Sequence, residues 1–83
     1  MNQPSSDAEI VAQVDALIAE EREIEHRSPD GLSAEDAERV RAMHVERDRL
    51  WDLKRERQAM RDAGRDPGEA VERSADVVER YQQ

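Results

Sequence analysis

The sequence lacks cysteine and phenylalanine, and Trp51 and Tyr81 are its only aromatic residues. Without cysteine the chain forms no disulfide bond, no thiolate metal site and no thiol nucleophile. Aromatic side chains usually supply much of the buried area of a core. The stability of this chain must therefore come from aliphatic stripes, helix caps and self-association. We expect one small domain that is marginally stable as a monomer.

Long apolar runs are also missing. No stretch approaches the roughly 20 apolar residues of a membrane-spanning helix. The first six residues contain no basic side chain, and no apolar run follows them, so we expect no signal peptide and a cytoplasmic protein. The formal net charge of −8 disfavours binding to nucleic acid and to anionic membranes.

The charge is unevenly distributed along the chain. Residues 1–30 carry eight acidic and two basic side chains, whereas residues 31–65 carry eight acidic and nine basic ones. Each stretch has the apolar spacing of a helix, and the turn-forming sequence Asp30-Gly31 lies between them. This order predicts that an acidic helix pairs with a basic one in the same chain.

Residues 7–27 have the pattern of an amphipathic helix. Ser6 and Glu9 have the spacing of a capping box, which predicts the helix start. Pro29 limits the helix because the residue before a proline disfavours helical geometry. The apolar residues recur every three or four positions, interrupted by Glu21. They are Ile10, Val11, Val14, Leu17, Ile18 and Ile24.

A second helix is predicted over residues 34–63, after a turn at residues 28–33. Ser33 is its expected N-cap. Gly64 stands where helices commonly end in a left-handed conformation. The apolar positions of this helix are Val40, Met43, Leu50, Trp51, Leu53 and Met60.

These patterns predict an all-α fold, an antiparallel two-helix coiled-coil hairpin over residues 7–64. A flexible N-terminus at residues 1–6 precedes the hairpin. A tail at residues 65–83 follows it, with short helical segments, one starting at Asp66-Pro67 and a last one carrying Val77, Val78 and Tyr81.

Matching the two apolar stripes also predicts how far the helices overlap. In the favoured register the first helix ends level with Trp51. Its acidic side chains then do not reach residues 54–63, which are left as a basic overhang. The expectation is that either the tail or a partner covers this overhang.

No set of residues predicts catalysis. Glu23 and His26 have the Glu-x-x-His spacing of half a di-iron site, but position 41, where a second motif would need its glutamate, is arginine. His44 is interpreted as a boundary residue at the core edge. No nucleophile–base pair and no glycine-rich phosphate loop is visible. We therefore predict no enzyme, no cofactor, no metal site and no small-molecule substrate.

The predicted interaction surface lies on the second half of the second helix and just beyond it. Its residues are Leu50, Trp51, Lys54, Arg55, Arg57, Met60, Arg61 and Arg65. Aromatic, methionine and arginine side chains are typical of protein interfaces. They favour a non-enzymatic interaction or adaptor protein, either a homodimer in a four-helix bundle or the binder of a foreign protein.

The alternative is a nucleic-acid- or ribosome-associated factor. Its phosphate contacts would be Lys54, Arg55, Arg57, Arg61 and Arg65, because arginine side chains suit phosphate groups. A structural interpretation of the same residues is that basic side chains favour the C-terminal end of a helix.

Several segments together resemble a known family. They are Gly31-Leu32-Ser33, Glu38-Arg39-Val40-Arg41, Leu50-Trp51-Asp52-Leu53, Arg55-Glu56-Arg57-Gln58-Ala59, Ala63-Gly64-Arg65-Asp66-Pro67 and Asp76-Val77-Val78-Glu79-Arg80-Tyr81. With them the chain resembles a small actinobacterial family of helical proteins, domain-of-unknown-function family 2630. The resemblance implies a short helical protein of a bacterial cytoplasm. It implies no activity, cofactor or catalytic residue.

Overall fold

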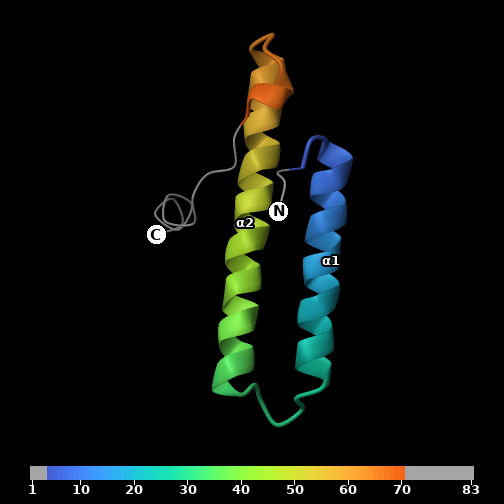
Figure 1. Ribbon diagram of the computed structural model, residues 1–83, viewed down its shortest axis with the longest axis vertical. Helices are drawn as coiled ribbons and strands as arrows, with labels where there is room; N and C mark the ends of the chain where they lie inside the picture. The colour runs from blue at the N-terminus through green and yellow to red at the C-terminus, as the bar shows by residue number, and fades with distance from the viewer. Residues whose placement is uncertain (1–3, 71–83) are drawn as a thin grey trace.

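The computed structural model describes residues 4–70 of the chain, which form a helical hairpin (Figure 1). Helix α1 spans Asp7–His26, helix α2 spans Ala34–Asp62, and a short 3-10 helix, η1, spans Pro67–Glu69. α1 and α2 lie side by side and antiparallel (Figure 1). The predicted all-α hairpin is confirmed, while the regular interdigitation of a coiled coil stays a prediction.

Serine side chains cap both long helices. The Ser6 hydroxyl accepts a hydrogen bond from the backbone N–H of Glu9 at 3.1 Å, and the Ser33 hydroxyl accepts one from Asp36 at 3.1 Å. The Glu9 carboxylate in turn accepts from the backbone N–H of Ser5 at 2.8 Å. These bonds satisfy N–H groups that a helix start otherwise leaves without partners.

Gly64 ends α2 and turns the chain back. Its φ of +74° lies in the left-handed region. Its N–H donates to the carbonyl of Arg61 at 3.0 Å, and the next N–H, of Arg65, donates to the carbonyl of Met60 at 2.8 Å. This bond pair is a Schellman motif. Asp66 then caps η1 by accepting from the N–H of Gly68 at 2.8 Å, as the sequence predicts for a short helical start. The predicted last helical piece, with Val77, Val78 and Tyr81, lies outside the described residues.

The buried residues form two clusters along the seam between the helices. The cluster nearer the open end of the hairpin contains Ile10, Val14, Leu50, Leu53 and Ala70, and the cluster nearer the turn contains Ile24, Val40 and Met43. Leu17 packs against both clusters. Because Ala70 follows η1, the returning chain completes the first cluster.

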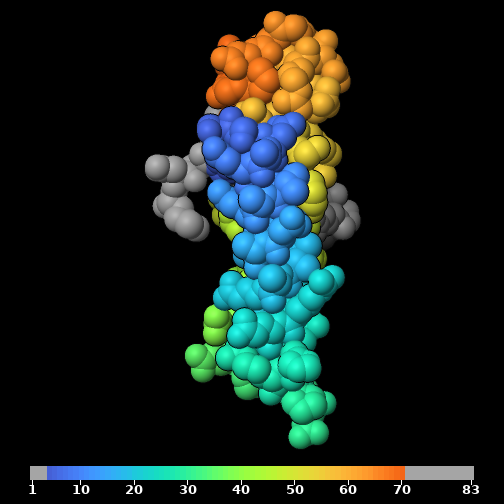
Figure 2. Space-filling view, turned by 90° about the vertical axis from the view of Figure 1, so that its right-hand side faces the viewer, coloured from blue at the N-terminus to red at the C-terminus, as the bar shows by residue number. Residues whose placement is uncertain are grey.

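The overlap of the helices is larger than the sequence predicts. Asp7, in the first turn of α1, contacts both Arg57 and Arg61 of α2. The expectation that α1 leaves residues 54–63 without an acidic neighbour is therefore wrong. The C-terminal end of α2 and η1 rise beyond the start of α1 (Figures 1 and 2).

Candidate interaction surface

The structure divides the eight predicted surface residues between the interior and the exterior. Leu50 is 1% exposed and belongs to the core. Met60 is half-buried and packs against the same cluster, and Arg57 is 9% exposed. These three side chains pack toward the interior of the hairpin, so the predicted surface is not one continuous exposed face.

Asp7 holds the two arginines at the centre of the predicted basic region. Its carboxylate accepts hydrogen bonds from Nε of Arg57 at 2.9 Å and from a terminal nitrogen of Arg61 at 2.8 Å. Arg57 also donates to the backbone carbonyl of Pro67 at 3.4 Å. Hydrogen bonds from Arg57 and Arg61 lower the pKa of Asp7. These two arginines therefore join the start of α1 to the end of α2.

The exposed part of the predicted surface surrounds Trp51, which is 37% exposed. Trp51, Lys54, Arg55 and Gln58 line a shallow hollow of about 250 Å³ on α2. These positions are separated by three, four and seven residues, the spacing of neighbours on one helix face. We call these four residues the Trp51 surface.

The Trp51 surface is basic. The Arg55 side chain is mostly exposed, and one of its terminal nitrogens lies 3.6 Å from Oδ1 of Asp52, one turn earlier in the helix. Lys54 is half-buried and is not within ion-pair distance of any carboxylate of residues 4–70. An exposed aromatic ring beside two cations is typical of protein-binding surfaces.

Arg65 lies outside the Trp51 surface, whereas Gln58 belongs to it. Arg65, the last predicted surface residue, follows α2 and pairs with Glu69 at 2.7 Å, away from the Trp51 surface. Gln58 was not among the predicted surface residues. Its position seven residues after Trp51 is the signal that identifies it.

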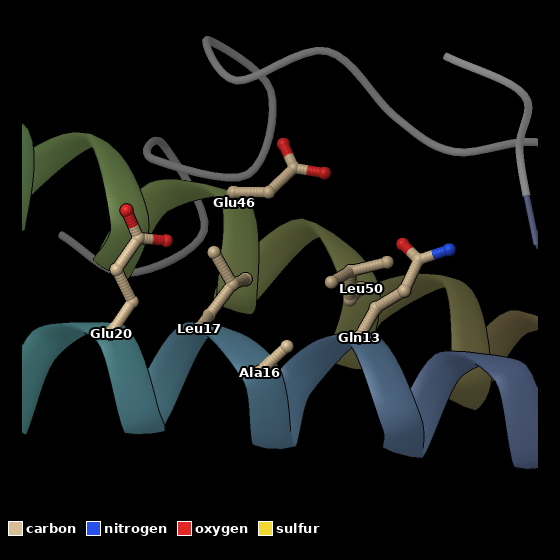
Figure 3. Close-up of a pocket in the computed structure, with 6 residues that line it drawn as sticks. All are labelled: Gln13, Ala16, Leu17, Glu20, Glu46 and Leu50. Atoms are coloured by element: carbon tan, nitrogen blue, oxygen red, sulfur yellow. The ribbon is translucent and has the colours of Figure 1, made fainter.

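A second hollow lies in the groove between the helices (Figure 3). It measures about 380 Å³, and it is lined by Gln13, Ala16, Leu17, Glu20, Glu46 and Leu50. Its acidic members already have partners, because Glu20 pairs with Arg39 at 3.2 Å and Glu46 with Arg49 at 3.2 Å. Sequence reasoning does not predict this groove.

A polar layer lies at the edge of the seam between α1 and α2. The carboxylate of Glu21 contacts Nε2 of His44 at 2.5 Å and a terminal nitrogen of Arg47 at 3.5 Å. The hydrogen bond with His44 and the positive charge of Arg47 lower the pKa of Glu21. His44 thus lies at the core edge, where the sequence places it, and its ring is engaged by a carboxylate of the same chain.

Glu23 and His26, the residues of the Glu-x-x-His pattern, lie near the C-terminal end of α1. Within residues 4–70 no three histidine, aspartate or glutamate side chains converge in a way that could hold a metal ion. His26, half of the Glu-x-x-His pattern, is exposed at the last residue of α1.

Residues 6–83 match the family described as "Protein of unknown function (DUF2630)". The chain belongs to this family. Proteins of Mycobacterium tuberculosis and Mycobacterium bovis, both described as uncharacterized, are 40% identical to it over 78 residues, covering 92% of this chain and 90% of theirs. The resemblance to a small actinobacterial family is thereby confirmed. No solved structure matches the chain.

A helix that spans a membrane needs roughly 20 consecutive, mostly apolar residues. Neither long helix within residues 4–70 has a stretch long and apolar enough to cross a bilayer.

Proposed function

We propose that this DUF2630 protein is a non-enzymatic interaction protein of the bacterial cytoplasm, and that its Trp51 surface binds another protein chain. The observation that carries the proposal is the exposure of Trp51 beside Lys54 and Arg55 on a continuous helix. A solvent-exposed tryptophan costs hydrophobic free energy, which contact with a partner recovers.

The hairpin suits such a role because its two ends are fixed. Asp7 ties the start of α1 to Arg57 and Arg61, and Ser33 and the turn fix the other end. A rigid helix presents its side chains at constant spacing, so less conformational entropy is lost on binding. The coiled-coil and homodimer predictions belong to this proposal.

A nucleic-acid- or ribosome-associated role is the weaker alternative. Of its five proposed phosphate contacts, Arg57 and Arg61 are held by Asp7 and Arg65 pairs with Glu69. Of the five, this leaves Lys54 and Arg55, and Arg55 itself lies 3.6 Å from Asp52, on a chain of net charge −8. Long-range repulsion of polyanions therefore outweighs their local attraction.

Site-specific photo-crosslinking in a mycobacterial cell tests the proposal. A photoreactive amino acid replaces Gln58, on the Trp51 surface, and in a matched strain it replaces Gln13, in the groove between the helices. We expect a protein adduct of defined mass from position 58 that disappears when Trp51→Ala is added. Adducts from position 13 alone, or from neither position, would contradict the proposal.

A further inference from the structure

The outer face of α2 carries charges that alternate at a fixed interval. Arg41, Asp48, Arg55 and Asp62 each follow the previous one by seven residues, so the signs read plus, minus, plus, minus. Seven residues fall about 20° short of two helical turns, which keeps all four on one slowly drifting stripe. Trp51 lies near the middle of this stripe.

The stripe is antisymmetric about its centre. Arg41 and Asp62 are equally far in sequence from the midpoint between Trp51 and Asp52, and Asp48 and Arg55 are also equally far from it. A two-fold rotation of α2 about that midpoint therefore puts each arginine of the stripe where an aspartate of the stripe was. A surface with this property is complementary to itself under a two-fold rotation.

We propose that a second copy of this chain docks antiparallel on α2, with the two-fold axis passing beside Trp51. Asp48 of one copy then faces Arg55 of the other, and Arg41 faces Asp62. Each pair occurs twice. The inference rests on the proposed function, and it names the partner of the Trp51 surface. A parallel, in-register pairing would instead set each charge against its own kind, which is unfavourable.

The positions of these side chains permit such docking. Arg41 and Arg55 are largely exposed even though each also contacts an acid one turn away, Glu38 at 3.2 Å and Asp52 at 3.6 Å. Asp62 is exposed and Asp48 is half-buried. A guanidinium group has five N–H donors, so it can serve a second carboxylate.

The length of the contact is sufficient for a specific helix pair. Between Arg41 and Asp62 the helix rises roughly 30 Å. A strict seven-residue repeat over this length favours a left-handed crossing of about 20°, the geometry of four-helix bundles. Two α2 helices at the centre and two α1 helices outside them would complete a four-helix arrangement, in which the two exposed tryptophans cover each other.

Charge reversal with purified full-length protein tests this register. Asp48→Arg and Arg55→Asp each place like charges opposite each other twice, so each variant alone should dimerise at least about tenfold more weakly in sedimentation equilibrium. Mixing the two variants should restore a heterodimer, because each altered side chain then meets an opposite charge. The double variant D48R/R55D should also recover the homodimer.

The matched controls are Asp15→Arg and Arg22→Asp, which reverse two exposed charges seven residues apart on α1. These controls should dimerise as the wild type does, and circular dichroism should show equal helix content in all variants. A monomeric wild type, or failure of the mixture to restore association, would overturn the inference. Loss of the dimer in the α1 controls would also overturn it, by placing the interface elsewhere.

The crosslinking and sedimentation results together distinguish a wrong partner from a wrong function. If position 58 crosslinks to a protein of another mass while the purified chain stays monomeric, the Trp51 surface binds a different partner. If position 58 gives no adduct in the cell, the proposed function itself is wrong.

Discussion

Removing the carboxylate charge of Asp7 should loosen the open end of the hairpin. Asp7 lies in the first turn of α1 and accepts from both Arg57 and Arg61. In Asp7→Asn the side chain keeps one acceptor oxygen, but Arg57, at 9% exposure, loses its charged partner. Apart from that oxygen, the acceptor that contacts Arg57 is the carbonyl of Pro67, through a long hydrogen bond.

The expected loss of stability depends on how far the Asp7–Arg57 pair is exposed to solvent. A hydrogen bond that involves a charged group contributes about 1.5–3 kcal/mol when it is buried. The Asp7 side chain is 33% exposed, so solvent screening reduces this value. We therefore expect Asp7→Asn to lower the free energy of unfolding by about 1–2 kcal/mol. For a chain of this size the melting temperature would fall by about 5–15 °C.

Thermal unfolding followed by circular dichroism measures the effect. The protein concentration must be low enough that self-association adds no stability. Asp7 also interacts with the positive end of the helix dipole, which is worth about 0.3–1 kcal/mol. A double-mutant cycle with Arg57→Gln removes that contribution, because the dipole effect is the same in both backgrounds.

The coupling free energy measured in this cycle can also refute the predicted contact. A coupling free energy near 1 kcal/mol between Asp7 and Arg57 is expected from a partly buried charged pair. If the two effects add to within about 0.3 kcal/mol, the side chains do not interact and the larger overlap of the helices is incorrect.

Three further predictions concern the core, the end of α2 and acid stability. Leu53→Ala, at a site with 0% exposure, should cost about 2–5 kcal/mol in urea unfolding, whereas Val11→Ala on the surface should change stability by less than about 0.5 kcal/mol. Gly64→Ala should cost about 1 kcal/mol in the same assay, since alanine is strained at a φ of +74°. The pKa values of Asp7 and Glu21 in the folded protein lie below the ordinary values of 3.8 and 4.5. The free energy with which these two carboxylates stabilise the fold is therefore fully present above the ordinary pKa values, and it is lost as the pH falls through the pKa values of the folded protein. Glu21→Gln should therefore flatten the acid limb of a stability–pH curve, and an unchanged limb would contradict this account of the polar layer.

The hairpin could be predicted because its signals are local. Ser6, Ser33 and Gly64 mark three helix ends with side-chain or backbone chemistry that acts within one turn. The apolar stripes likewise depend only on helical period. These signals are independent of how the two helices meet.

The register could be predicted only approximately, because it depends on charged pairs between distant residues. Matching the apolar stripes fixes the relative position of the two helices along their axes to within about one turn. A shift of one turn decides whether Asp7 reaches Arg57. Glu21 illustrates the same limit. In the sequence it interrupts an apolar stripe, and its partners His44 and Arg47 are identified only when the helices are aligned.

The candidate surface could be predicted only in part, because the burial of its side chains also depends on how the two helices meet. Composition identifies a region rich in arginine, methionine and tryptophan, but it does not separate the side chains that turn inward from those that turn outward. Arg57 and Arg55 are two residues apart, and their roles differ because one meets Asp7 while the other projects beside Trp51. The returning chain after Gly64, which covers part of the core with Ala70, has no simple apolar signal in the sequence.

The claim that the Trp51 surface joins two copies of this chain is tested most directly by sedimentation velocity over a range of concentrations. We expect the wild type to change from monomer to dimer as its concentration rises. Trp51→Ala should stay monomeric over the same range while keeping its helix content. A wild type that remains monomeric throughout, or a Trp51→Ala variant that dimerises equally well, would contradict this claim.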